Sequence, residues 1–277
     1  EGVWENARVV PSLQRMIGAQ RELWGEFPSS QPYYFFNALS GARGGLEHKQ
    51  STVLMADRWL SRTPSGVNSW LSLASHEYFH TWNGKRLRPV VLGPFDYEKE
   101  VYTRSLWVVE GITSYYQHLM LQRAGVTSAQ DCLAAMGSLI ASYQAAPGRL
   151  VQSLGDSSFD TWIKAYRPDE NTPNTTVSYY SVGSLAGFLL DAEIRRVSHG
   201  THSLDDAMRL AFQRYSGAHG YSDAEFIAVV NEVAGADLTS WFQRYIYRPG
   251  EFDLQPALDW FGLALASDPA DQPGSGR

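Results

Sequence analysis

The segment HEYFH at residues 76–80 constrains this chain more than any other stretch. Two histidines four residues apart lie on one face of an α-helix, one turn apart, so both imidazoles can reach a single metal ion. Glu77, directly after the first histidine, is placed to activate a metal-bound water. The alternative is a buried helix whose histidines only satisfy local hydrogen bonds. Apolar neighbours favour a core helix that holds its ligands rigidly, and they include Trp70, Leu71, Leu73 and Ala74.

A third ligand is needed, because a catalytic zinc site uses three protein ligands and leaves the fourth position to water. Glu110 is the one acidic residue in the apolar and aromatic run at residues 106–116. Lone carboxylates in such runs are rarely buried unless they are paired or bound to a metal. A salt bridge to Arg104 or to a distant arginine is the alternative. We favour the ligand, because two histidines and one glutamate complete an open zinc site.

Three segments, in this order, resemble the catalytic part of the glycyl aminopeptidase family of zinc metallopeptidases, which is a thermolysin-like group. They are HEYFHTWNGKRLRP at 76–89, PFDYEKEVYT at 94–103 and LWVVEGITSYY at 106–116. The resemblance implies that His76, His80 and Glu110 bind one Zn²⁺ ion and that Glu77 is the general base. It also implies hydrolysis of peptide bonds, with a preference for N-terminal glycine or alanine.

The glycine-rich residues 40–48, SGARGGLEH, lie between two β-like runs. In related aminopeptidases a Gly-x-Met-Glu-Asn strand lines the substrate cleft, and its glutamate holds the free amino group of the substrate. By this resemblance Glu47 holds that group and Gly44, Gly45 and His48 contact the substrate, with the histidine in place of asparagine. A carboxylate near the scissile bond favours an ammonium group and so measures the distance from the chain end. An ordinary glycine turn is the alternative.

Residues 178–187, SYYSVGSLAG, resemble the Tyr-x-Lys-Gly pattern that opens a helix in relatives. There the tyrosine stabilises the oxyanion, which can contribute a few kcal/mol to transition-state stabilisation. Tyr180 matches by its distance to Gly183, although Val182 stands in the place of the lysine. Tyr179 is the fallback for this role. The alternative for either is a packing tyrosine beside an apolar helix.

Composition narrows the class of protein. At 277 residues the chain can bury a sizeable core, and 44% hydrophobic and 19% charged residues are ordinary for a globular protein. The net charge of −6 argues against a nucleic-acid footprint, and no apolar run is long enough to span a membrane. Cys132 is the single cysteine, so no intrachain disulfide forms, and we interpret it as a packing residue.

The pattern and the resemblance together predict a mostly helical α+β fold, namely a thermolysin-like catalytic domain with a small mixed β-sheet and a helical lobe. We expect one domain over residues 1–266, with a sheet and zinc-helix lobe to about residue 88 and a helical lobe over residues 89–266. The Pro-, Gly- and Asp-rich residues 267–277 are expected to be a disordered tail. The polar residues 154–176 read as an extended loop, and residues 237–247 as the last helix.

Members of the resembled family usually also carry an N-terminal β-domain and a C-terminal PDZ-like domain. Neither is visible, so we expect the chain to be the catalytic part of a longer protein. Its expected partner is a peptide with a free N-terminus. The compartment is not readable from the N-terminus, and a bacterial, exported or periplasmic location is the one we favour. Three other functions stay open: a zinc endopeptidase of the same fold, a catalytically silent peptide-binding module and a structural zinc protein. The last is the least favoured, because structural sites normally close all four positions with protein ligands.

Overall fold

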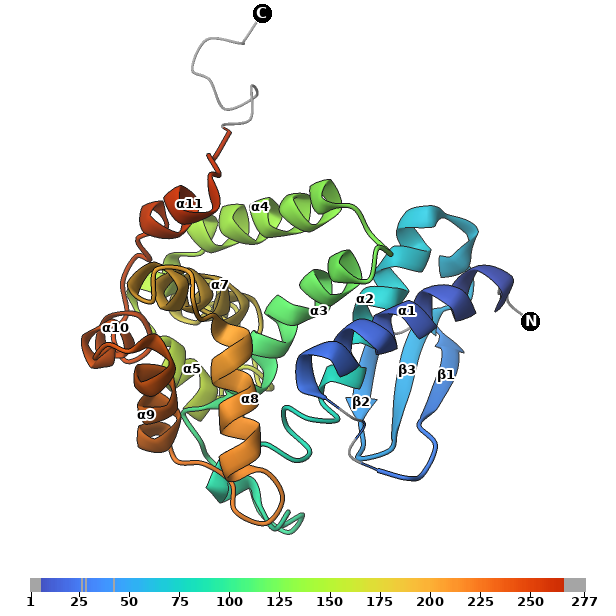
Figure 1. Ribbon diagram of the computed structural model, residues 1–277, viewed down its shortest axis with the longest axis horizontal. Helices are drawn as coiled ribbons and strands as arrows, with labels where there is room; N and C mark the ends of the chain where they lie inside the picture. Colours follow the sequence, from blue (N-terminus) through green and yellow to red (C-terminus); the bar gives the residue numbers. More distant parts are fainter. Residues whose placement is uncertain (1–5, 26, 28, 42, 267–277) are drawn as a thin grey trace, which may run out of the picture.

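The computed structural model describes residues 6–266 apart from residues 26, 28 and 42. The tail predicted at residues 267–277 lies outside the described residues. A small three-stranded sheet with two helices against it forms one side of the molecule, and a larger group of helices forms the other (Figure 1). The predicted class, mostly helical α+β with a small mixed sheet, is confirmed. No described helix is long and apolar enough to span a membrane.

The sheet has the order β1-β3-β2 and contains both parallel and antiparallel pairs. Strand β1 (Tyr34–Ser40) is parallel to β3 (Ser51–Asp57), and β2 (Gly44–Glu47) is antiparallel to β3. Leu54 and Ala56 of β3 are buried, because alternate residues of a strand face the helices that cover one side of the sheet. The glycine-rich segment is therefore an edge strand and not only a turn.

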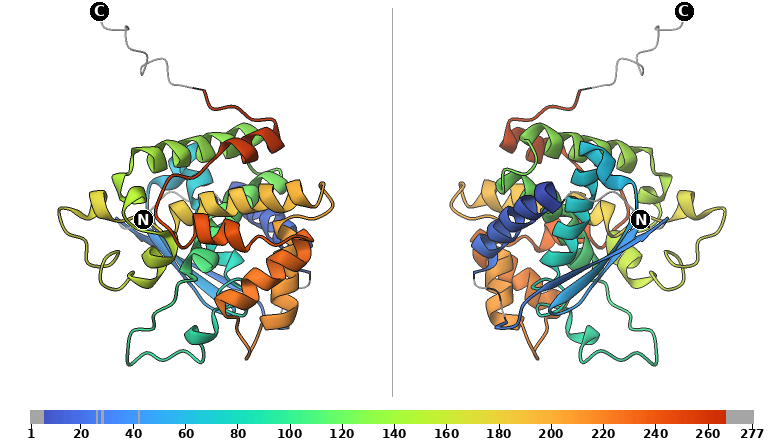
Figure 2. Two further views of the ribbon diagram at one scale, coloured as in Figure 1. Left: turned by 90° about the vertical axis from the view of Figure 1, so that its left-hand side faces the viewer. Right: turned by 90° about the vertical axis from the view of Figure 1, so that its right-hand side faces the viewer.

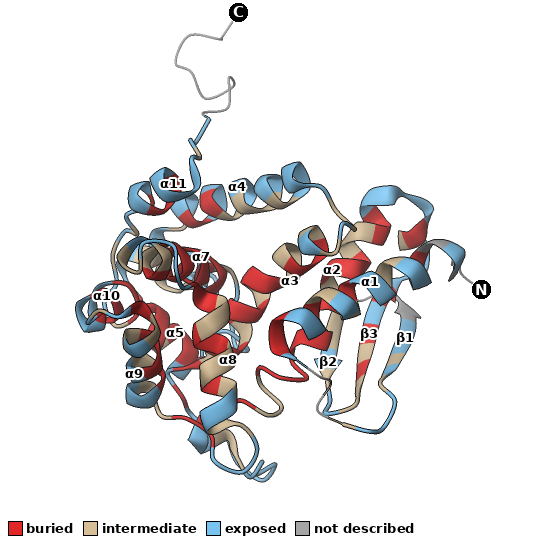
Figure 3. Cartoon of the chain, viewed as in Figure 1, coloured by how far each residue is buried: buried red, intermediate tan, exposed pale blue. Residues whose placement is uncertain are grey.

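Helix α2 (Pro64–Phe79) lies in the interior of the molecule and packs against the sheet, and helix α1 (Asn6–Trp24) packs against α2 (Figures 1 and 3). The start of α2 is fixed by Thr63, whose hydroxyl accepts a hydrogen bond from a backbone N–H of the first turn at 3.0 Å. Gln20 of α1 donates through Nε2 to the carbonyl oxygen of Ser75 at 2.9 Å. This buried contact ties the two helices together one residue before the HEYFH motif.

The segment that carries Glu110 begins with a π-helical turn, η3 (Trp107–Gly111), and continues as α3 (Ile112–Arg123). Asn83, just beyond α2, donates through Nδ2 to the carbonyl oxygen of Val108 at 2.8 Å. Such π-turns are frequent at functional sites, and this one is held against the end of α2 by the asparagine.

The remaining helices form the larger lobe, in which α7 is the most buried (Figure 3). Helices α4 and α11 lie side by side along one edge (Figures 1 and 2). The bounds are α4 (Ala129–Ala145), α5 (Leu154–Phe159), α6 (Thr172–Thr175), α7 (Ser181–Val197), α8 (Leu204–Tyr215), α9 (Asp223–Ala234), α10 (Thr239–Tyr245) and α11 (Gln255–Phe261), with short 3₁₀ turns at η1 (Leu60–Arg62), η2 (Val90–Leu92) and η4 (Pro147–Leu150).

The extended loop predicted at residues 154–176 is wrong at both ends, where α5 and α6 form. Ser153 caps α5, because its hydroxyl accepts a hydrogen bond from the backbone N–H of Asp156 at 3.0 Å. Leu154, the first residue of this helix, is buried. A cap and one buried side chain therefore outweigh the polar composition of the segment. Helix α11 has no counterpart among the predicted elements.

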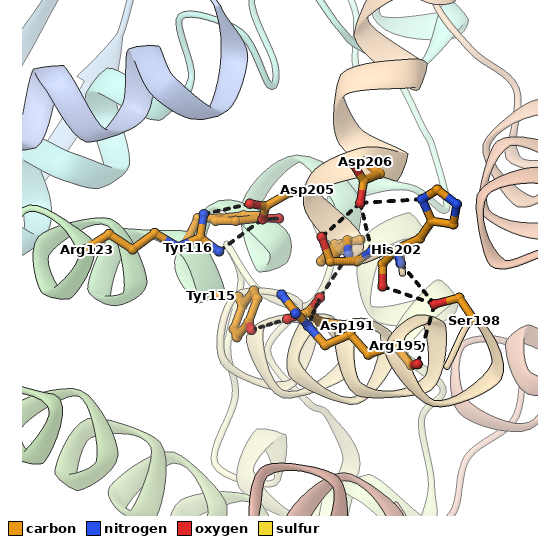
Figure 4. Close-up of polar contacts among 11 residues, drawn as sticks. Tyr115, Tyr116, Arg123, Asp191, Arg195, Ser198, His202, Asp205 and Asp206 are labelled. Atoms are coloured by element: carbon orange, nitrogen blue, oxygen red, sulfur yellow. Dashed lines mark hydrogen bonds and ion pairs between the residues drawn. The ribbon is translucent and has the colours of Figure 1, made fainter. Parts of the chain in front are cut away.

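A buried carboxylate joins three helices of the large lobe (Figure 4). Asp191 of α7 is 2% exposed and accepts hydrogen bonds from the hydroxyl of Tyr115 on α3 at 2.9 Å and from Nε of Arg195 at 3.0 Å. It also accepts from the backbone N–H of Leu204, the first residue of α8, at 2.8 Å. The carboxylate thus satisfies a free helix-end donor while it orients α3.

Candidate active site

Three ligand-type side chains converge where α2 meets the π-turn. Oε2 of Glu110 lies 3.1 Å from Nε2 of His76 and 3.2 Å from Nε2 of His80. Both histidines are buried, and one ligand atom from each of the three residues lies within 4.8 Å of the others. The structure therefore brings together the three residues that the sequence pattern and the family resemblance had paired. Two imidazole nitrogens and one carboxylate are a donor set that suits Zn²⁺.

The far nitrogen of each imidazole is also engaged. Nδ1 of His76 lies 2.9 Å from Oε1 of Gln117 on α3, and Nδ1 of His80 lies 2.8 Å from the carbonyl oxygen of Asn83. An N–H at each Nδ1 donates to these oxygens, so Nε2 of each ring is the atom that can bind a metal once it has lost its proton. The sequence pattern assigns no role to Gln117. Its position seven residues after Glu110, two helical turns on, is the signal that points to it.

Charge and burial oppose each other at the carboxylate ligand. Burial on its own raises the pKa of Glu110, but the His80 charge and hydrogen bonds from both histidines outweigh it and hold that pKa well below its ordinary value. Burial lowers the pKa of His80, yet the charge and hydrogen bond of Glu110 raise it to about 10. Protons and metal ions compete for the same atoms here, because a ligand imidazole must be neutral to bind a metal.

Glu77 lies under the edge strand of the sheet. It is 5% exposed, and burial raises the pKa of its carboxyl against the opposing charges of His80 and His76. Gly45 of β2 passes so close that a Cβ at this position would collide with the Glu77 carboxylate. Only glycine allows this approach of backbone to side chain, which gives the predicted glycine-rich segment a physical role at the site.

Glu47 ends the same strand and lies near the histidines. One of its oxygens, one from Glu77 and a nitrogen of His80 are all within 4.8 Å of one another. Nζ of Lys85 is 2.9 Å from Oε1 of Glu47 and also lies over the ring of Phe95, 5.2 Å from its centroid. Burial alone would raise the pKa of Glu47, but His80 and Lys85 lower it. The carboxylate is therefore ionised and already paired. The sequence pattern assigns no role to Lys85.

Tyr180 immediately precedes α7 and faces the ligands. Its ring stacks on that of His76, with centroids 6.1 Å apart and an interplanar angle of 27°. Burial raises the pKa of the phenol far above its ordinary value, and the charge of Glu110 adds to this, so the hydroxyl keeps its proton. Gly111 and Gly183 make this position possible, because a Cβ on either would collide with the backbone of the other.

Tyr179, the fallback for the same role, is placed differently. It is buried, and its hydroxyl accepts a hydrogen bond from Oγ1 of Thr161 at 3.1 Å. Only Tyr180 of the two lines the cleft at the ligands. The geometry therefore favours Tyr180 as the hydroxyl that can reach a reacting group.

A cleft of about 330 Å³ opens at these residues. Leu73, expected to pack in the core, lines it, and so do three side chains to which the sequence pattern assigns no role, Arg43, Ser114 and Gln117. His48 does not line the cleft. It is exposed at the end of β2, and its Nδ1 faces the carbonyl oxygen of Leu46 at 3.2 Å. The other lining residues are Gly44, Gly45, Glu47, His76, Glu77, His80, Glu110 and Tyr180.

Comparisons with known proteins find similarity to aminopeptidases. Residues 69–186 match the model of the M61 glycyl aminopeptidase family. The crystal structure of an aminopeptidase N family protein from Idiomarina loihiensis is similar over 94% of this chain, with 31% identity and a TM-score of 0.89. This chain covers 45% of that protein, so it spans less than half of its length. No curated protein matches the sequence significantly.

A second solved structure supports the fold alone. Native yeast LTA4 hydrolase is similar over 87% of this chain and 35% of its own, with a TM-score of 0.56 and 17% identity. Together the matches confirm the resemblance stated from the sequence motifs and the thermolysin-like class of the fold.

Proposed function

Since residues 69–186 match the M61 glycyl aminopeptidase family, we propose that this protein is a Zn²⁺-dependent aminopeptidase that releases glycine or alanine from the N-terminus of peptides. One observation carries the proposal: His76, His80 and Glu110 converge as ligands while Glu77 lies beside them in the same cleft. This combination provides a metal site and a general base within reach of one substrate bond.

A bound zinc ion would act as a Lewis acid toward the scissile carbonyl and make the attacking water more acidic. Glu77 would accept a proton from that water and deliver it to the leaving amine, and burial makes its carboxylate a stronger base than an exposed glutamate. The protonated hydroxyl of Tyr180 would donate a hydrogen bond to the developing oxyanion. Gln117 and Asn83 would hold the two imidazole rings in the orientation that this chemistry needs.

Recognition of the amino end would fall to Glu47. Lys85 contacts Oε1 of this carboxylate, and the second oxygen stays available to a substrate ammonium group. A peptide held there would place its first peptide bond near Glu77, because the two carboxylates lie within 4.8 Å of a shared histidine atom. The small cleft of about 330 Å³ at this end is compatible with a small first residue.

The Lys85–Glu47 ion pair is also the observation that favours a second candidate, a zinc endopeptidase of the same fold. A carboxylate that is already neutralised by a lysine attracts a substrate ammonium less strongly. An endopeptidase would cleave N-acetylated peptides and would not depend on Glu47.

Hydrolysis of glycyl- and alanyl-p-nitroanilide by the zinc-loaded protein, beside Glu77→Gln, tests the proposal. We expect turnover in the parent and a loss of about 100-fold or more in the variant, with unchanged zinc content by atomic absorption. Equal cleavage of an N-acetylated peptide, unaffected by Glu47→Gln, would establish the endopeptidase instead. Zinc binding without turnover of any of these substrates would contradict both and leave the peptide-binding module.

A further inference from the structure

A second and larger hollow adjoins the candidate active site. This apolar groove, as we call it, has a volume of about 830 Å³ and lies between α3, α4, α7 and the region of α11. Figures 1 and 2 show how α4 and α11 run together along this edge of the molecule. Ser114, Gln117 and Tyr180 line both the groove and the metal cleft, so the two spaces meet at these residues.

The lining of the groove differs in chemistry from the cleft. None of its described lining residues is Asp, Glu, Lys or Arg, whereas the cleft contains three carboxylates. Leu133 is 41% exposed and Phe261 is 36% exposed. Exposed apolar surface gathered in a concave site marks a place where an apolar group binds. The main apolar lining residues are Leu119, Leu133, Met136, Leu139, Phe188 and Phe261.

The direction of a bound peptide follows from the two ends of the combined space. Glu47, on the sheet side, lines the cleft and not the groove, while Tyr180 lies between them. A peptide whose amino end is at Glu47 and whose first carbonyl is at Glu77 therefore continues past Tyr180 toward the helical lobe. The groove lies on the leaving-group side of the scissile bond. A volume of about 830 Å³ is in the range of sites that bind a drug-sized ligand, so it exceeds one side chain.

We propose that the apolar groove binds bulky apolar side chains of the peptide on the leaving-group side of the scissile bond. The preferred substrates are then peptides in which a small first residue is followed by large apolar residues such as leucine. This inference rests on the proposed aminopeptidase function. Charged side chains at these positions are disfavoured, because the groove would remove their water without offering a charged partner.

Two tripeptides measure this preference in the zinc-loaded protein, namely Gly-Gly-Gly and Gly-Leu-Leu. We expect kcat/KM to be about 10-fold or more higher for Gly-Leu-Leu, the scale of discrimination that an apolar pocket provides. Leu133→Gln should reduce this ratio toward one, because it removes apolar contact with the leucine side chains of Gly-Leu-Leu. Leu150→Gln is the matched control, because Leu150 is 56% exposed and lies outside the groove; it should keep the ratio. A ratio that Leu133→Gln leaves intact would overturn the proposal.

Cys132 provides a second readout that needs no turnover. It is the single cysteine of the chain and lines the groove at a half-buried position. In the Glu77→Gln protein, Gly-Leu-Leu should slow alkylation of Cys132 by N-ethylmaleimide, and Gly-Gly-Gly should not. Protection of Cys132 without hydrolysis by the parent protein would support peptide binding in the groove and contradict the aminopeptidase function. Hydrolysis without protection, or protection that follows protein concentration because a second copy covers the groove, would overturn the groove proposal.

Discussion

Gly45 and Glu77 are in direct contact across the edge of the sheet, where the Glu77 carboxylate fills the space that a Cβ on Gly45 would need. We predict that Gly45→Ala displaces either the Glu77 carboxylate or strand β2. Since a shift of about 1 Å at a reacting group costs roughly 100-fold in rate, kcat/KM should fall by about that factor. Hydrolysis of glycyl-p-nitroanilide measures it.

Gly41→Ala is the matched control for this change. A Cβ on Gly41 meets nothing within 4 Å, so its activity should stay within about twofold of the parent. Both variants should bind zinc as the parent does, because neither position carries a ligand. A Gly45→Ala protein with full activity would mean that the close approach of Gly45 does not set the position in which Glu77 acts.

The parts of the site that the sequence predicts are those set by local periodicity. His76 and His80 are one helical turn apart, and any helix brings them together. Glu110 can be identified as the acidic residue of an apolar run. Its position beside the histidines depends on a π-turn, which the sequence pattern does not predict. The match of these residues to a family motif is what assigned all three to one metal ion.

The parts that the sequence misses depend on distant packing. In the sequence, Gln117 and Lys85 do not differ from other polar residues. Gln117 gains its role from contact with His76, and Lys85 gains its role from contact with Glu47. The backbone carbonyl of Asn83 that orients His80 has no sequence signature at all. Helix α5 was not predicted for a related reason, since its stability comes from a cap and one buried leucine rather than from composition.

Gln117 should control metal affinity without touching the metal. Replacing it by alanine removes the acceptor for Nδ1 of His76, so the ring is free to turn and to change its tautomer. We predict that Gln117→Ala weakens zinc binding by about 10- to 100-fold. Competition with a chromogenic chelator measures the zinc Kd. Gln144→Ala, at an exposed position of α4, is the control and should leave the Kd unchanged. Equal affinities in both variants would contradict the orienting role.

Asp206 links stability to pH at the start of α8. Its Oδ2 accepts from the backbone N–H of Ser203 at 2.9 Å, and its Oδ1 accepts from Nη2 of Arg209 at 2.7 Å. Burial alone would raise the pKa of Asp206, but these partners lower it. The stabilisation is therefore complete above the ordinary aspartate pKa and is lost as pH falls through the lower native value.

Asp206→Asn should accordingly reduce the free energy of unfolding by about 1 kcal/mol near neutral pH. The difference from the parent should shrink as pH falls below about 3.9, the value for an unperturbed aspartate. Urea unfolding followed by circular dichroism at a series of pH values measures both. A difference that is constant with pH would show that the charge of Asp206 does not contribute.

Asp191 should matter most for the stability of the large lobe, because three donors from α3, α7 and α8 depend on one buried carboxylate (Figure 4). Asp191→Ala leaves Arg195, the Tyr115 hydroxyl and the first N–H of α8 without this acceptor. Removal of one partner of a buried pair costs about 3–5 kcal/mol, which urea unfolding should detect. Glu170→Ala, at an exposed position, should cost less than about 0.5 kcal/mol.

Because Asp191 is outside the metal cleft, the Asp191→Ala protein that remains folded at low temperature should still bind zinc with the affinity of the parent. A loss of zinc affinity in that folded variant would show that the network also positions the ligand helix α3.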